Sequence, residues 1–190
     1  NKYVMIRYLP FLFVLLWSSA FITSKIIVDN SSPFAALAFR FSIVSFGFFI
    51  FSLFNKEKII INTNQIIVAS VSGILFHGIY LGGVFYAISI GMPTSVVALI
   101  VSMQPILTNI LAGPFLSEEV SWKQWIGIIL AFIGSFLVIG YDIGDTITLK
   151  GLFFTILALL GATIATIWQK KFSEKISLFV SNFYQSLAAC

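Results

Sequence analysis

The stretch IIINTNQIIVASVSGILFHGIYLGGVFYAISIGMPTSVVALIVSMQPILTNILAGPFLS, residues 59–117, runs for 59 residues without an Asp, Glu, Lys or Arg. About 20 apolar helical residues are enough to cross the hydrocarbon core of a membrane. This stretch is therefore too long for one span. Gly91-Met92-Pro93 marks the natural break, because Gly ends helices and Pro suits the first turn of the next one. The stretch predicts two membrane helices, over about residues 65–89 and 94–117.

The composition of the whole chain excludes the common soluble classes. The 190 residues are 59% hydrophobic and only 9% charged, whereas soluble domains are about one quarter charged. The 21 Phe residues exclude a disordered chain, which could not keep them in water. The 11 basic residues are dispersed and form no phosphate-binding face, so no nucleic-acid partner is expected. The single cysteine, Cys190, excludes an intrachain disulfide and a cysteine metal cluster.

The remaining charge-poor blocks predict further membrane helices. They are continuously apolar and do not alternate, which favours helices over barrel strands. The expected class is an all-α membrane protein with a bundle of about seven transmembrane helices in this chain. The further helices are expected at about 8–28, 33–54, 121–140 and 149–172, with a seventh from 176.

Basic residues set the expected orientation. If the N-terminus is cytoplasmic, eight basic residues lie on the inner side and only Lys25 and Lys150 on the outer side. We therefore expect a cytoplasmic N-terminus. The eight inner residues are Lys2, Arg7, Lys56, Lys58, Lys123, Lys170, Lys171 and Lys175.

Small residues spaced four apart predict where helices pack closely in lipid. Three predicted helices carry such a face. These residues are Gly78 and Gly82, then Gly127, Ala131 and Ser135, then Ala158 and Ala162.

The beginning of the chain recurs in outline 145 residues later, as a helix, a charged hinge and a second helix. Seven positions are identical under this offset, among them Lys25 and Lys170. A unit of five helices would insert its second copy upside down, which is the inverted repeat of secondary transporters. Two units need about 290 residues (2 × 145), so the natural chain is expected to continue by roughly 100 residues beyond Cys190.

Several short motifs follow one another in the order of a known family. The chain resembles the EamA-type transporters of the drug/metabolite transporter superfamily. The segment 116–121, LSEEVS, resembles the acidic turn of that family, with Glu118 at the motif position. The other motif residues are Leu16-Trp17-Ser18-Ser19-Ala20-Phe21, Lys25, Ser32-Pro33, Arg40, Phe85-Tyr86-Ala87, Thr94-Ser95, Gln104-Pro105, Gln124 and Gly127.

The resemblance implies a ten-helix fold of two inverted five-helix repeats. Residues 1–145 would form the first repeat and residues 146–190 the start of a truncated second one. It implies a permease or exporter of small organic metabolites or drugs, working by alternating access in the bacterial inner membrane. The expected partners are a small-molecule substrate and the lipid bilayer; a homodimer is left open, and no cofactor or metal is expected. The alternative is a non-transporting membrane scaffold or a subunit of a larger complex.

Polar side chains in the predicted spans are the site candidates, because such groups are costly in lipid. Arg40 could attract an anionic or zwitterionic substrate, or it could reach outward or pair with Asp29. His77 could carry a proton, but a neutral imidazole bonded to a neighbouring helix is favoured. Tyr80, one turn further on, could line a cavity or anchor the interface, and Trp17 joins these candidates.

The predicted span 94–117 carries the other candidates. Pro105 leaves the carbonyl of Val101 without its helical partner, so a kink is expected there. Gln104 and Thr108 share a face, with Asn109 beside it, and a substrate cavity is preferred over a structural role. No catalytic residue is proposed, because the sequence has no HExxH, GxSxG or Walker motif.

Overall fold

A computed structural model describes residues 2–116, 121–139, 147–172 and 176–190 as helices joined by short connections, without a strand in those ranges. The expected all-α class is confirmed, because each long apolar block satisfies its backbone polar groups within a helix. The elements are α1 (Lys2–Asn30), α2 (Pro33–Phe54), α3 (Thr63–Gly73), the π-helix η1 (Ile74–Leu81), α4 (Gly82–Ser89), α5 (Thr94–Ser102), α6 (Gln104–Leu116), α7 (Trp122–Ile139), α8 (Leu149–Phe172) and α9 (Leu178–Ala188).

Within the described ranges, five helical segments are long and apolar enough to cross a membrane. Their bounds combine neighbouring elements where these are continuous, so that α3, η1 and α4 form one segment. The five segments are Phe11–Asn30, Pro33–Phe54, Thr63–Ser89, Thr94–Leu111 and Leu149–Phe172.

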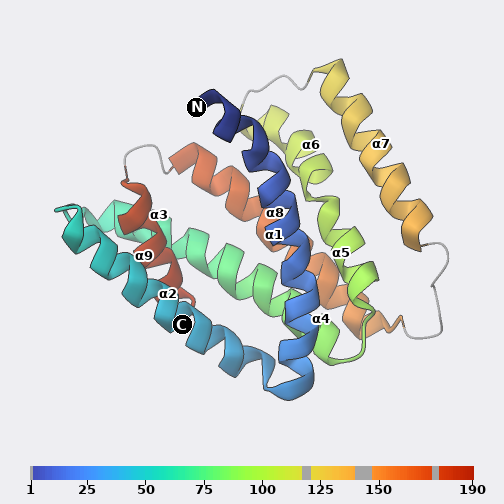
Figure 1. Cartoon of the computed structure of the whole chain (residues 1–190), viewed down its shortest axis with the longest axis horizontal. Helices are drawn as coiled ribbons and strands as arrows, with labels where there is room; N and C mark the ends of the chain where they lie inside the picture. The colour runs from blue at the N-terminus through green and yellow to red at the C-terminus, as the bar shows by residue number, and fades with distance from the viewer. Residues whose placement is uncertain (1, 117–120, 140–146, 173–175) are drawn as a thin grey trace.

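Helix α8 lies at the centre of the bundle and packs against η1, α4, α6, α3 and α5 (Figure 1). Helix α9 packs against α2 and α3, on the other side of the molecule from α7. Helix α7 lies at the edge, beside α5. The segments near the two ends of the sequence thus contribute to one bundle, and α8 separates the α9 side from the α7 side.

Two predicted helices are interrupted near their middle. The segment Thr63–Ser89 passes through the π-helix η1, which carries His77 and Tyr80. The segment after Pro93 ends α5 at Ser102 and begins α6 at Gln104, with Met103 between them. Pro105 therefore lies in the first turn of α6, where its missing N–H disrupts least.

At two glycines the helices pack so closely that the nearest neighbour of an added Cβ would be a backbone atom of another helix. A Cβ on Gly73 would overlap the backbone of Gln185 in α9, and a Cβ on Gly83 would lie 2.8 Å from the carbonyl oxygen of Phe154 in α8. The expected packing at Ala158 and Ala162 is confirmed, since both are fully buried (0% exposed). The same expectation for Gly78 and Gly127 is wrong, because no described neighbour lies within 4 Å of their Cβ positions. Spacing alone did not reveal which face of each helix meets a neighbour.

Side-chain hydrogen bonds tie α8 and α9 to the segment around α3. The Tyr184 hydroxyl donates to the carbonyl of Ile59 at 3.2 Å, and the indole N–H of Trp168 donates to the carbonyl of Val68 at 3.1 Å. The Ser177 hydroxyl also donates to the carboxylate of Glu57. The bonds of Tyr184 and Ser177 hold α9 beside α2 and α3, where α9 forms one wall of a cavity. The bond of Trp168 joins α8 to α3.

Candidate functional site

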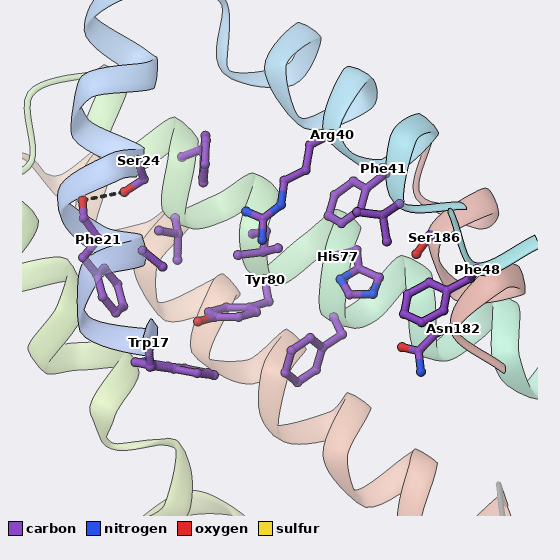
Figure 2. Close-up of a pocket in the computed structure, with 16 residues that line it drawn as sticks. Trp17, Phe21, Ser24, Arg40, Phe41, Phe48, His77, Tyr80, Asn182 and Ser186 are labelled. Carbon is purple, nitrogen blue, oxygen red and sulfur yellow. Dashed lines mark hydrogen bonds between the residues drawn. The ribbon is translucent and has the colours of Figure 1, made fainter. Parts of the chain in front are cut away.

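Two cavities contain all seven candidate cavity residues. The first, the Arg40 cavity, has a volume of about 290 Å³ and lies between α1, α2, η1, α4 and α9. Figure 2 shows it with its lining side chains. Four of the candidates line it, namely Trp17, Arg40, His77 and Tyr80.

The second cavity, the Gln104 cavity, has a volume of about 710 Å³ and lies between α1, η1, α5, α6 and α8. It is the larger and more open of the two. The remaining candidates line it together with Trp17: Gln104, Pro105, Thr108 and Asn109.

Trp17 and Phe76 border both cavities. Trp17 stacks on Tyr80 with ring centroids 6.4 Å apart, and Phe76 meets Tyr80 edge to face at 5.3 Å. Two aromatic side chains, from α1 and η1, therefore stand where the cavities adjoin. Trp17 was among the cavity candidates that the sequence suggested, whereas Phe76 was not anticipated.

Arg40 extends from α2 across the Arg40 cavity toward Tyr80 (Figure 2). Its guanidinium carbon lies 5.9 Å from the ring centroid of Phe41, and it makes no ion pair or hydrogen bond with any described residue. The expected alternative of a pair with Asp29 is not formed, because Asp29 accepts from the ammonium group of Lys25 at 2.8 Å. The guanidinium charge thus faces the cavity.

His77 and Tyr80 come from the π-helix. Atom Nδ1 of His77 is buried and lacks a hydrogen-bond partner among the described residues. The imidazole instead packs on the ring of Phe41 at 4.7 Å, so the expected bond from His77 to a neighbouring helix is not found. Tyr80 is 4% exposed and borders the same cavity. Both residues therefore line the same cavity as Arg40.

Gln104 has a different environment. Its Nε2 donates to Oγ1 of Thr166 at 2.9 Å, and more weakly to the carbonyl of Ala162 at 3.4 Å, both on α8. Thr108 shares the cavity, but its buried hydroxyl finds no partner in the described part of the chain. Gln104 thus connects the break between α5 and α6 to the central helix.

The structure adds residues that the sequence did not suggest. Asn182 and Ser186 of α9 complete the Arg40 cavity, and Thr166 and Gln169 of α8 complete the Gln104 cavity. They lie in parts of the chain that carried no recognised motif, and only the packing of α8 and α9 brings them in. The acidic-turn candidate, Glu118, lies outside the described residues.

The described residues contain no cluster of His, Cys, Asp or Glu that could hold a metal ion. The two cavities instead combine aromatic walls with isolated polar groups. That combination is typical of sites for small organic molecules.

Residues 6–140 match the EamA-like transporter family. This match covers more than half of the chain and includes all the residues of α2, α3, η1, α4, α5, α6 and α7. No solved structure gives a significant match.

Comparison with curated proteins finds bacterial relatives. A Salmonella typhimurium (strain LT2) protein named "Probable amino-acid metabolite efflux pump" is 26% identical over 88% of this chain and 54% of its own length. The Escherichia coli (strain K12) protein of the same name is 26% identical over 86% of this chain and 52% of its own. "Uncharacterized transporter YyaM" of Bacillus subtilis (strain 168) is 31% identical over 71% of this chain and 44% of its own. The chain spans about half the length of these relatives.

Proposed function

Since the chain belongs to the EamA-like transporter family, we propose that it works as a secondary carrier of small organic metabolites or drugs. It would use alternating access, with the N-terminus on the cytoplasmic side of a bacterial inner membrane. The names of two relatives make amino-acid metabolites the first substrates to test. Residues 1–145 would form the first repeat and residues 146–190 the beginning of the second.

The observation that carries this proposal is the pair of cavities meeting at Trp17 and Phe76. A carrier needs a polar site within the membrane that opens to one side at a time. In this proposal the two aromatic side chains form the partition, and a substrate passes them when the helices around α1 and η1 rearrange. The break at Met103, next to the Gln104 cavity, supplies a place where the helices can bend.

The alternative is a membrane scaffold without transport activity. The hydrogen bond between Gln104 and Thr166 favours this alternative, because it gives a candidate site residue a structural role between two helices. The two functions differ in a measurable way. Only a carrier exchanges a labelled substrate for an unlabelled one across a sealed membrane.

We would reconstitute the protein, in the length in which cells make it, into proteoliposomes loaded with unlabelled phenylalanine or 3-phenylpropanoate. Uptake of the labelled compound by counterflow is the readout. We expect counterflow with at least one of the two, and a loss of at least about tenfold in Trp17→Ala, because the partition is removed. The matched control is Trp122→Ala, since Trp122 is an exposed tryptophan on α7 outside both cavities.

Absence of counterflow with either compound, in a protein that melts cooperatively, would contradict the carrier proposal and favour the scaffold. Equal rates in Trp17→Ala and the wild type would place the partition elsewhere. Equal losses in Trp17→Ala and Trp122→Ala would show a general effect on the fold.

A further inference from the structure

We propose that the Arg40 cavity selects an organic monoanion, a carboxylate on a small aromatic body, over zwitterions and cations of the same shape. This rests on the proposed function, since it names the ligand class of the carrier site. It also goes beyond the names of the relatives, because a free amino acid carries an ammonium group, and the described residues that line this cavity include no carboxylate to pair with it.

The first step is the charge of the cavity. Arg40 is the one ionised side chain among its described lining residues, which include no carboxylate. The two carboxylates of the described residues are engaged elsewhere, Asp29 with Lys25 at 2.8 Å and Glu57 with the hydroxyl of Ser177. A cation in an apolar span is costly without a counter-charge, so an anionic ligand would stabilise it.

The second step is the set of unused hydrogen-bonding groups. A guanidinium has five N–H donors in a fixed fork that matches a carboxylate. Nδ1 of His77 is buried without a partner, and the Tyr80 side chain borders the same space (Figure 2). These groups come from two elements, α2 and η1, and meet in one cavity. If the guanidinium holds one carboxylate oxygen, the hydroxyl of Tyr80, which lines the same cavity, can donate to the other.

The third step is the room for the rest of the ligand. Seven aromatic side chains line the cavity: Trp17, Phe21, Phe41, Phe48, Phe76, Tyr80 and Phe85. Its volume of about 290 Å³ is at the lower end of the range for small-molecule sites. The body of the ligand is therefore small and apolar, and a single aromatic ring with a short chain fits this description.

The fourth step is discrimination. A zwitterion of the same shape would satisfy Arg40 but bury an ammonium group near a like charge, with no carboxylate among the described lining residues to receive it. Aromatic faces offer such a cation only weak compensation for lost water. A cation without a carboxylate would meet Arg40 directly. The expected order of affinity is anion first, zwitterion second and cation last.

The experiment uses three compounds with the same phenethyl body: 3-phenylpropanoate, phenylalanine and phenethylamine. Equilibrium binding to the purified protein in lipid nanodiscs is measured by calorimetry, without any transport step. We expect 3-phenylpropanoate to bind at least about tenfold more tightly than phenylalanine, and phenethylamine to bind most weakly. Arg40→Gln should weaken binding of 3-phenylpropanoate by about 10- to 100-fold, because a charge-assisted pair is lost.

Two further variants test the geometry. Arg40→Lys keeps the charge but lacks the fork, so it should recover part of the affinity lost in Arg40→Gln. Lys58→Gln removes an exposed cation outside the cavity and should leave binding unchanged. The melting temperature of each variant shows whether it is folded.

The inference is overturned if the folded protein binds phenylalanine as tightly as 3-phenylpropanoate, or binds none of the three. It is also overturned if Arg40→Gln and Lys58→Gln have the same affinity for 3-phenylpropanoate. Anion-selective binding without counterflow would refute the carrier and leave this inference standing. Counterflow without anion preference would do the reverse.

Discussion

The Arg40 cavity and the Gln104 cavity share a wall but treat their polar groups differently. In the Arg40 cavity, Arg40 and Nδ1 of His77 have no hydrogen-bond partner among the described residues. In the Gln104 cavity, the amide of Gln104 is bonded to Thr166 on α8 at 2.9 Å. The guanidinium of Arg40 is therefore left to pair with a ligand, whereas the amide of Gln104 joins α6 to α8.

This difference separates two kinds of effect that substitutions should have. Changes to the partnerless groups of the Arg40 cavity should alter ligand affinity more than stability. Changes around Gln104 should alter stability first, because a lost interhelical bond leaves its partner unpaired. The distinction would be wrong if substitutions in the two cavities had the same effects on ligand affinity and on stability.

The largest loss of stability is expected where α3 packs against α9, the helix that lines the Arg40 cavity but not the Gln104 cavity. Gly73→Ala places a Cβ against the backbone of Gln185 in α9, and a backbone cannot move aside as a side chain can. Because α9 supplies Asn182 and Ser186 to the cavity, forcing it away from α3 should also weaken binding there. We expect a loss of about 1–3 kcal/mol in unfolding free energy, read as a lower melting temperature in detergent.

Gly47→Ala is the matched control, since Gly47 also lies in a helix and has no described neighbour within 4 Å of its Cβ position. Alanine has a higher helix propensity than glycine at both positions, so helix propensity cannot explain a loss of stability in Gly73→Ala. Equal melting temperatures for the two variants would mean that α3 and α9 are not so closely packed.

A smaller effect should distinguish the Gln104 cavity. A double-mutant cycle of Gln104→Met and Thr166→Val measures the bond between α6 and α8. Polar contacts between membrane helices contribute about 0.6 kcal/mol on average and up to about 1.7. We expect a coupling energy in this range from equilibrium unfolding in mixed micelles.

Thr163→Val replaces Thr166→Val in the control cycle, because the Thr163 hydroxyl donates within its own helix, to the carbonyl of Leu159 at 2.8 Å. Its coupling to Gln104→Met should be close to zero. A coupling as large as that of Thr166 would indicate a general disturbance of α8.

The smallest effect is expected at Thr108. Its buried hydroxyl has no partner in the described residues, so Thr108→Val removes an unsatisfied group and should not lower the unfolding free energy. Thr155→Val is the comparison, because that buried hydroxyl donates to the carbonyl of Gly151 at 2.8 Å. Chemical unfolding of both variants under one set of conditions is the measurement. A clear loss of stability in Thr108→Val would show that its hydroxyl has a partner after all.

The membrane class and the family were accessible from the sequence. Residues 59–117 contain no Asp, Glu, Lys or Arg, and the whole chain has few charges. Such a chain is expected to form helices in a bilayer, because a helix satisfies its own backbone polar groups. Ordered motifs around Trp17, Arg40 and Gln104-Pro105 were enough to indicate the family that the match over residues 6–140 then identified. The division into inverted repeats stays a prediction.

The arrangement of the candidate site was not accessible. Gln104 and Thr166 are 62 residues apart, and a single sequence carries no record of which distant residues meet. The separation of the candidates into two cavities depends on where α8 and α9 pack, which apolar helices do not reveal. Local sequence patterns predicted which polar residues lie within the membrane spans. Tertiary packing decides which of these residues have hydrogen-bonding groups without a partner.

The π-helix η1 also affects how well this membrane span can tolerate the deletion of a residue during evolution. Deleting one residue from an ordinary membrane helix rotates all following side chains by about 100° and turns their packing face away. Residues 74–81 are wound more loosely than an α-helix, with bonds reaching one residue further. A single deletion there can be absorbed by tightening to α-helical geometry, which leaves α3 and α4 facing their neighbours. A deletion should therefore disturb helix packing least at this point of the span, although it would change how His77 and Tyr80 face the cavity.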